Sequence, residues 1–312
     1  MEAVLNPALI LFLSGIITGI TFKLTLPNSI SKYLGYYLLL ALGLKGGLSL
    51  QENGFINDVI SALSLGILFA LLIPAIAYIY LKNILNTDDA AALSGTYGSV
   101  SAVTFVTAIA YLSTTNQDFD NYMSAVLVVM EFPAIFMALY LVTHNKINKG
   151  TNLQTIKTAF LEIPNIILIS SLFVGYFVNK TVISNIDIFI VTIFDYILYV
   201  FLFVMGTRVA KRTGELKGKG VNLIAFALLT PLIGSLIALL ASINFDLSVG
   251  NSTLLMVLTA SASYIAVPAV VKDAIPDANP AIYLGLSLGV TFPFNIIFGI
   301  PLYNELAKYF IG

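Results

Sequence analysis

The sequence has no cysteine and a single histidine among its 312 residues. Disulfides, cysteine nucleophiles and metal sites built from His and Cys side chains are therefore excluded. The one histidine, His144, is followed by Asn145 and Lys146, a setting typical of a solvated residue at the end of a membrane span. We predict that the chain is not an enzyme and has no cofactor. A membrane-embedded Ser-His hydrolase is the enzyme alternative, and it would depend on His144.

Charged side chains are also scarce. They make up 10% of the residues, whereas hydrophobic residues make up 58%. A soluble domain carries about a quarter charged residues, so this chain cannot cover a water-exposed surface, and we predict an all-α integral membrane protein in a lipid bilayer. The few basic residues stand in short loops without interleaved aromatic residues, so nucleic-acid binding has no support.

Hydrophobic stretches follow one another along the whole chain. Most of them reach the ~20 residues that a helix needs to cross the hydrocarbon core. We expect ten transmembrane helices, at about residues 7–22, 30–48, 56–82, 90–112, 121–143, 162–179, 188–207, 221–243, 250–271 and 280–309.

The two halves of the chain are similar to each other at an offset of 160 residues. This offset places Gly15 on Gly175, Gly46 on Gly206, Ser101-Ala102 on Ser261-Ala262, and Phe132-Pro133 on Phe292-Pro293. Five spans in each half force the second copy to enter the membrane upside down, which is the inverted-repeat architecture of many secondary transporters. We therefore predict two inverted five-helix repeats, at residues 1–145 and 161–312, joined by a cytoplasmic connector at 146–160.

The basic residues indicate how the spans are oriented. Of the 15 Lys and Arg residues, all except Lys45, Lys180 and Lys308 fall in or beside the odd-numbered loops. The positive-inside rule places these loops in the cytoplasm. We predict a multi-pass protein of the cell inner (plasma) membrane with both termini outside.

Small and hydroxyl-bearing residues interrupt two of the spans. The fourth contains residues 94–104 (SGTYGSVSAVT), and the ninth contains residues 259–268 (TASASYIAVP). Gly95 and Gly98 weaken the first of these helices, and Pro268 removes a backbone hydrogen bond from the second. We expect both helices to be discontinuous near the middle of the membrane, where an unpaired hydroxyl or peptide group costs about 2 to 7 kcal/mol.

Two discontinuous helices can form an anion site without Lys or Arg. Their free N–H groups and positive dipole ends would face one another across a pseudo-twofold axis, and Ser and Thr hydroxyls would complete the site. The predicted substrate-binding residues are Gly98, Ser99, Ser101, Thr104, Ser261, Ser263 and Tyr264. The alternative is that these residues only allow transmembrane helices to pack closely.

A carboxylate lies within the fifth span. Glu131 precedes Phe132-Pro133 and matches Thr291 in the tenth span, while Asn295 stands one helical turn after Thr291. A carboxylate inside a span costs roughly 2.5 to 3.5 kcal/mol on insertion scales and is usually functional. We predict that Glu131, Thr291 and Asn295 supply oxygen ligands to a cation. A proton carrier, or a bond to the backbone freed by Pro133, is the alternative for Glu131.

Several motifs carry a resemblance to a known family. They lie at residues 44–47 (LKGG), 96–101 (TYGSVS), 130–134 (MEFPA), 275–280 (IPDANP) and 299–302 (GIPL). Over nearly its whole length, the chain resembles the sodium-dependent bicarbonate transporter family known from cyanobacteria. The resemblance implies ten helices in two inverted repeats, a core and a gate domain, a homotrimer, and substrate and sodium bound between the discontinuous helices. It also implies that a PII-like regulator can bind from the cytoplasm.

The ninth span departs from that family. Cyanobacterial members have Ser-Asp-Ile-Ser-Gly-Pro-Pro where this chain has residues 263–269 (SYIAVPA), so Tyr264, Ala266 and Val267 replace Asp, Ser and Gly. We predict a secondary active transporter that takes up bicarbonate with sodium as the coupling ion by alternating access. The alternatives are a symporter or a channel for another small anion or carboxylate, and a different coupling ion.

Overall fold

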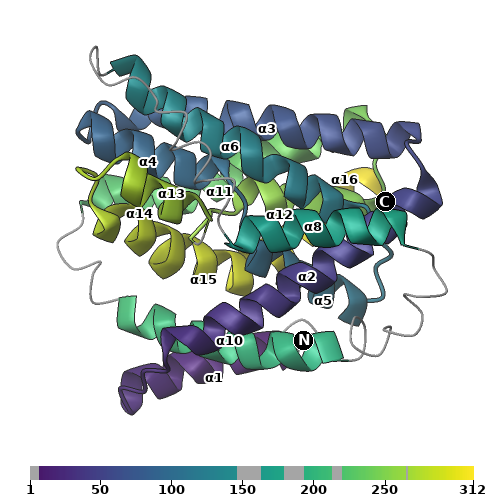
Figure 1. Ribbon diagram of the computed structural model, residues 1–312, viewed down its shortest axis with the longest axis horizontal. Coiled ribbons are helices and arrows are strands. Elements are labelled where there is room, and N and C mark those ends of the chain that lie inside the picture. The colour runs from purple at the N-terminus through teal and green to yellow at the C-terminus, as the bar shows by residue number, and fades with distance from the viewer. Residues whose placement is uncertain (1–6, 146–162, 179–192, 213–219, 265) are drawn as a thin grey trace.

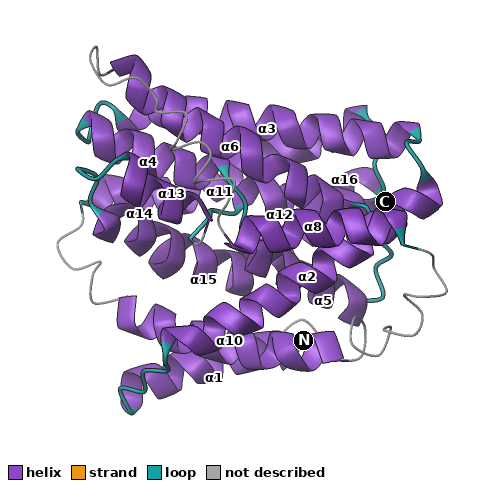
Figure 2. Ribbon diagram, viewed as in Figure 1, coloured by secondary structure: helices purple, strands orange, loops and turns teal. Residues whose placement is uncertain are grey.

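The computed structural model describes residues 7–145, 163–178, 193–212, 220–264 and 266–312 (Figure 1). Every regular element within these ranges is a helix (Figure 2). The predicted connector at 146–160 lies outside the described residues, as does the first part of the span predicted at 188–207.

The helices follow the predicted spans wherever the chain is described. Their bounds are α1 Pro7–Thr21, α2 Asn28–Asn53, α3 Asn57–Leu81, α4 Thr87–Gly98, α5 Ala102–Thr114, α6 Met123–Asn145, α8 Ile163–Phe177, α10 Ile193–Arg212, α11 Val221–Asn244, α12 Val249–Ala260 and α13 Ala266–Ala274. Within the described ranges, 6 helical segments are long and apolar enough to cross a membrane, counting α4 with α5 as one. This confirms the all-helical membrane character that the composition predicts.

The last helical stretch, residues 280–311, is continuous but irregular. It consists of α14 Pro280–Leu286, the π-turn η4 Ser287–Thr291, α15 Phe292–Phe294, the π-turn η5 Asn295–Gly299, and α16 Ile300–Ile311. Pro293 and Pro301 each follow one of these π-turns. Since proline has no N–H to donate, a wider turn before it lets the helix continue around the missing bond.

Two helix pairs bring together segments that are far apart in the sequence. Helix α1 packs along α10, and α2 packs along α8 (Figure 1). Glycines allow the backbones to touch: a Cβ atom on Gly15 would lie 2.1 Å from the Phe203 carbonyl oxygen, and one on Gly206 would lie 2.2 Å from that of Phe12. Such close approach is how helices associate in lipid, where the hydrophobic effect does not drive them together.

The second pair uses glycines in the same way. A Cβ atom on Gly175 would lie 2.4 Å from the Leu44 carbonyl oxygen, and one on Gly47 would lie 2.1 Å from that of Leu172. Gly46, which the sequence offset matched to Gly206, faces Ser124 of α6 instead. The neighbouring Gly47 therefore occupies the position against α8.

We expect the Gly206→Ala variant to unfold at a lower temperature than the wild type in detergent, as measured by a thermal unfolding assay. The added methyl group would clash with the backbone of α1, which cannot move aside as a flexible side chain can. Overpacking of this kind lowers the free energy of unfolding by about 1 to 3 kcal/mol. Gly35→Ala in α2 is the control, because its Cβ atom would meet only a Phe201 ring atom at 3.6 Å. Equal melting temperatures for the two variants would contradict the close contact of α1 and α10.

Candidate functional site

The two interrupted helices meet at their breaks. The Ser101 N–H, between α4 and α5, donates to Ser261 Oγ at 2.9 Å. The Ser263 N–H, between α12 and α13, donates to the Thr96 carbonyl oxygen at 2.9 Å. These reciprocal bonds join residues that lie in opposite halves of the sequence. We call residues 96–104 and 259–264, with the bonds between them, the crossover.

Each break has the same local construction. Ser99 and Ser261 directly follow helices α4 and α12. Their backbones are extended, with φ −91° and ψ 169° at Ser99 and φ −87° and ψ 165° at Ser261. The next helices then begin under serine caps: Ser101 Oγ accepts from the Thr104 N–H at 3.2 Å, and Ser263 Oγ accepts from the Val267 N–H at 3.3 Å. The positive ends of α5 and α13 are therefore both directed into the crossover.

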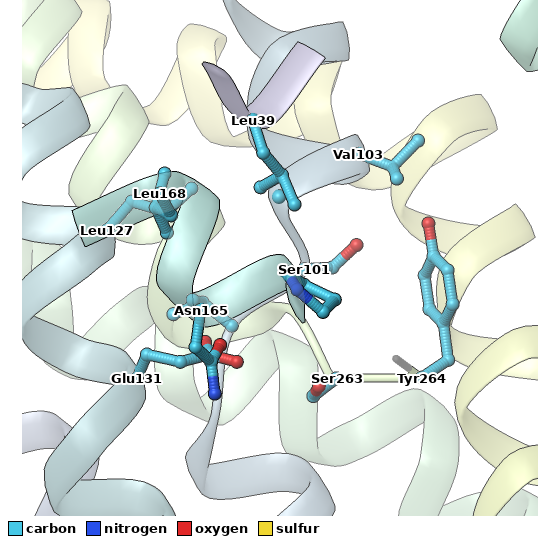
Figure 3. A pocket seen from close by; sticks show the side chains of 12 residues that line it. Leu39, Ser101, Val103, Leu127, Glu131, Asn165, Leu168, Ser263 and Tyr264 are labelled. Carbon is cyan, nitrogen blue, oxygen red and sulfur yellow. The ribbon is translucent and has the colours of Figure 1, made fainter. Parts of the chain in front are cut away.

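A small cavity of about 40 Å³ lies beside the crossover. Its polar lining consists of Ser101, Glu131, Asn165, Ser263 and Tyr264, and its apolar lining includes Leu39, Leu127 and Leu168 (Figure 3). A cavity needs about 10 to 15 Å³ for one water molecule, so this one has room for a few heavy atoms. It suits a small ion or molecule rather than a larger metabolite.

Glu131 is the one charged residue among the described residues that line this cavity. It lies in α6, its side chain is 7% exposed, and its Oε2 accepts a hydrogen bond from Ser99 Oγ at 3.1 Å. This bond ties the carboxylate to the break between α4 and α5. A buried charge is retained only where it is paired, hydrogen-bonded or bound to a cation. The bond from Ser99 meets this requirement in part, and the role of Glu131 as a cation ligand stays a prediction.

Three of the predicted substrate-binding residues line the cavity: Ser101, Ser263 and Tyr264. The others hold the crossover together. Thr104 Oγ1 donates to Ser101 Oγ at 2.9 Å, and Ser261 accepts the Ser101 N–H. Gly98 packs on α3, where a Cβ atom would lie 2.5 Å from Pro74 Cγ. Ser99 bonds to Glu131.

Thr291 and Asn295 do not line the cavity with Glu131. Thr291 Oγ1 donates to the Ala227 carbonyl oxygen at 2.7 Å and accepts from the Tyr97 hydroxyl at 2.5 Å. Asn295 Nδ2 donates to the Ala260 carbonyl oxygen at 2.8 Å, at the end of α12. Both residues thus fasten the irregular last helix to its neighbours, and their role as cation ligands stays a prediction.

Asn165 is a cavity residue that sequence reasoning missed. It lies in the first turn of α8 and is 3% exposed. An amide so near the end of an apolar span resembles an ordinary interfacial residue in the sequence. Only its burial among apolar side chains shows that it belongs to the site.

His144, the residue on which the hydrolase alternative depends, belongs to the end of α6. Its side chain lies outside the described part of the structure.

Apolar helices of membrane-spanning length, two of them broken around a buried polar cavity, define a multi-pass membrane protein of the transporter class. A family model described as the Na+-dependent bicarbonate transporter superfamily matches residues 7–308. The chain belongs to this superfamily, which confirms the resemblance seen in its motifs. Membership in a transporter family implies that the chain is not an enzyme. No curated protein matches the sequence.

We expect Ser261→Ala to lower the melting temperature of the detergent-solubilised protein. The substitution leaves the buried Ser101 N–H without its acceptor, a loss that costs about 1 to 3 kcal/mol. Ser242→Ala is the matched control, because Ser242 Oγ is equally buried in α11 and has no hydrogen-bond partner in the described part of the chain. Equal melting temperatures for the two variants would show that the bond between the two breaks does not contribute to stability.

Proposed function

We propose that the protein is a sodium-coupled bicarbonate symporter that works by alternating access. The observation that carries this proposal is the crossover, where two helix N-termini and three hydroxyl-bearing side chains meet at a cavity beside a buried carboxylate. Helix N-termini stabilise anions without a basic side chain. Membership in the bicarbonate transporter superfamily supports bicarbonate as that anion.

Glu131 is our candidate for the cation side of the site. Its carboxylate and the Ser99 hydroxyl offer oxygen atoms of the kind that hard cations prefer. Moving one negative charge into a cell against an inside-negative potential costs about 2.3 kcal/mol per 100 mV. A sodium ion that travels with bicarbonate removes this cost. Thr291 and Asn295 would then fix the last helix and the end of α12 around the site.

The packing supports two inverted repeats as the architecture. If α1 corresponds to α8 and α2 to α10, the pairing of α1 with α10 becomes the pairing of α8 with α2, as a twofold axis requires. We further propose that α1, α2, α8 and α10 form the gate domain, and that the other helices form the core domain. We also propose that the protein lies in the inner membrane of the cell. The positive-inside rule supports an orientation in which the odd-numbered loops are cytoplasmic.

The starts of the two broken helices are held in matching ways, which also supports the repeat. Near the start of α4, Asp89 Oδ1 accepts from the Asn279 N–H at 2.6 Å. Near the start of α12, Asn251 Oδ1 accepts from the Asp120 N–H at 2.8 Å. In each case the partner lies in the loop before the last helical segment of the opposite half.

The second candidate is a symporter or channel for another small anion or carboxylate. It is favoured by Tyr264, which lines the cavity where cyanobacterial members of the family have Asp. The homotrimer and the PII-like cytoplasmic regulator remain predictions that follow from the resemblance alone.

We expect proteoliposomes to accumulate radiolabelled bicarbonate only with an inward sodium gradient, at clamped membrane potential and at alkaline pH, where little of the substrate is present as permeant CO2. Protein-free liposomes are the control. Equal flux with and without sodium would indicate a channel or a different coupling ion. Absence of uptake by folded protein would overturn bicarbonate as the substrate, and a screen of small carboxylates would follow.

We expect Glu131→Gln to lower sodium-dependent uptake about tenfold or more, since a bond to a charged partner contributes about 1.5 to 3 kcal/mol. The amide keeps the shape of the side chain but removes the charge that faces the cation. Glu305→Gln in α16 is the control, because that carboxylate is 66% exposed and pairs only with Lys308 in the described contacts. Unchanged sodium dependence in Glu131→Gln would remove Glu131 from the cation site.

A further inference from the structure

A second and larger cavity adjoins the crossover cavity. Its volume is about 460 Å³, and it lies between α2, α5, α8 and α10. The two cavities share Leu39, Ala102, Val103, Pro164 and Tyr264 as lining residues. From this shared wall the larger cavity extends toward the ends of α2 and α10 that carry Lys32 and Arg208.

Among the described residues, the two charged ones that line the larger cavity are both positive. They are Lys32, whose Nζ lies 5.7 Å from the centre of the Tyr36 ring, and Arg208, whose Nη2 donates to Asn28 Oδ1 at 2.9 Å. Charged side chains in membrane proteins face the bundle interior or water-filled cavities. The lining of this cavity therefore indicates water, and it favours small anions.

A different groove of this protein provides a comparison. It has a volume of about 260 Å³ and lies between α3 and α11. Its described lining consists of apolar side chains, Gly234, Thr230 and Tyr80, and contains no charged residue. The contrast separates the cavity near Arg208 from the ordinary irregularities of the outer surface.

Tyr264 stands between the two cavities. Its ring packs on Phe292 with the ring centres 5.4 Å apart, and Figure 3 shows its hydroxyl extending away from Ser263 toward the level of Val103. The hydroxyl is buried, and it makes no hydrogen bond of ordinary geometry with any residue that the structure describes. A buried donor without a partner is costly, and here it lies where an anion would pass from one cavity to the other.

We propose that the larger cavity is a water-filled vestibule for small anions, that Arg208 and Lys32 set its charge selectivity, and that the Tyr264 ring closes it off from the crossover cavity. The vestibule opens toward the membrane face that we predict to be cytoplasmic. Positive charges around a narrow, low-dielectric entrance raise the local concentration of anions. The identity of the anion as bicarbonate rests on the proposed function. The preference of the vestibule for anions over cations does not.

The absence of cysteine from the native sequence allows a direct test. A Ser31→Cys variant carries one thiol on the vestibule wall. Its modification by a sulfonate-bearing methanethiosulfonate and by a quaternary-ammonium methanethiosulfonate of similar size is followed by intact mass. After correction for their rates with a free thiol, we expect the anionic reagent to react about tenfold faster.

Adding Arg208→Gln should bring this ratio of rates toward one, and so should high salt, which screens the charges. Ser113→Cys, exposed at the far end of α5, is the control whose ratio Arg208→Gln should leave unchanged. Faster reaction of Ser31→Cys with the cationic reagent, or an unchanged ratio after Arg208→Gln, would overturn the anionic selectivity.

The role of Tyr264 is tested with Val100→Cys, which lines the crossover cavity but not the vestibule. Adding Tyr264→Ala should speed sulfonate modification of this thiol about tenfold, whereas Tyr264→Phe, which keeps the ring, should not. Equal rates in the two double variants, with both shown to be folded by thermal unfolding, would overturn the barrier. These labelling rates do not depend on transport. The vestibule can therefore be confirmed when bicarbonate uptake is absent, and it can be overturned when uptake is present.

Discussion

The whole site depends on one constraint, which is that a peptide group inside a membrane must find a partner within the protein. Interrupting two helices at mid-span frees several such groups at once. Hydrogen bonds between the two breaks satisfy these groups. The Ser101 N–H donates to the Ser261 hydroxyl, and the Ser263 N–H donates to the Thr96 carbonyl oxygen. The Asn295 amide donates to the last carbonyl of α12. The breaks are therefore tolerable only together, since each supplies the partner that the other lacks.

The sequence predicted the interruptions because they follow from local chemistry. Glycines and hydroxyl-bearing residues before Ser101, and Pro268 after Ser261, weaken a helix wherever they stand. The placement of these breaks against one another followed from the internal repeat. The helical membrane character needed only the composition.

What the sequence could not supply was which neighbour each side chain meets. Gly98, a predicted substrate residue, packs on Pro74, which lies more than twenty positions earlier in the chain. Asn295, a predicted cation ligand, bonds to Ala260 and Tyr303. Such partners are set by how helices that are distant in the sequence pack on one another, and no local spacing encodes that. Asn165 was missed for the same reason.

The pairing of α1 with α10 also constrains how the protein is made. Helix α1 ends at Thr21, and its partner α10 begins only at Ile193. At about 5 to 20 residues per second during synthesis, the glycine face of α1 waits roughly ten to forty seconds in the bilayer before its partner emerges from the ribosome. Neither half of the chain can complete its own helix packing. The first half must therefore be inserted with the packing faces of α1 and α2 unpaired until α10 and α8 of the second half are inserted.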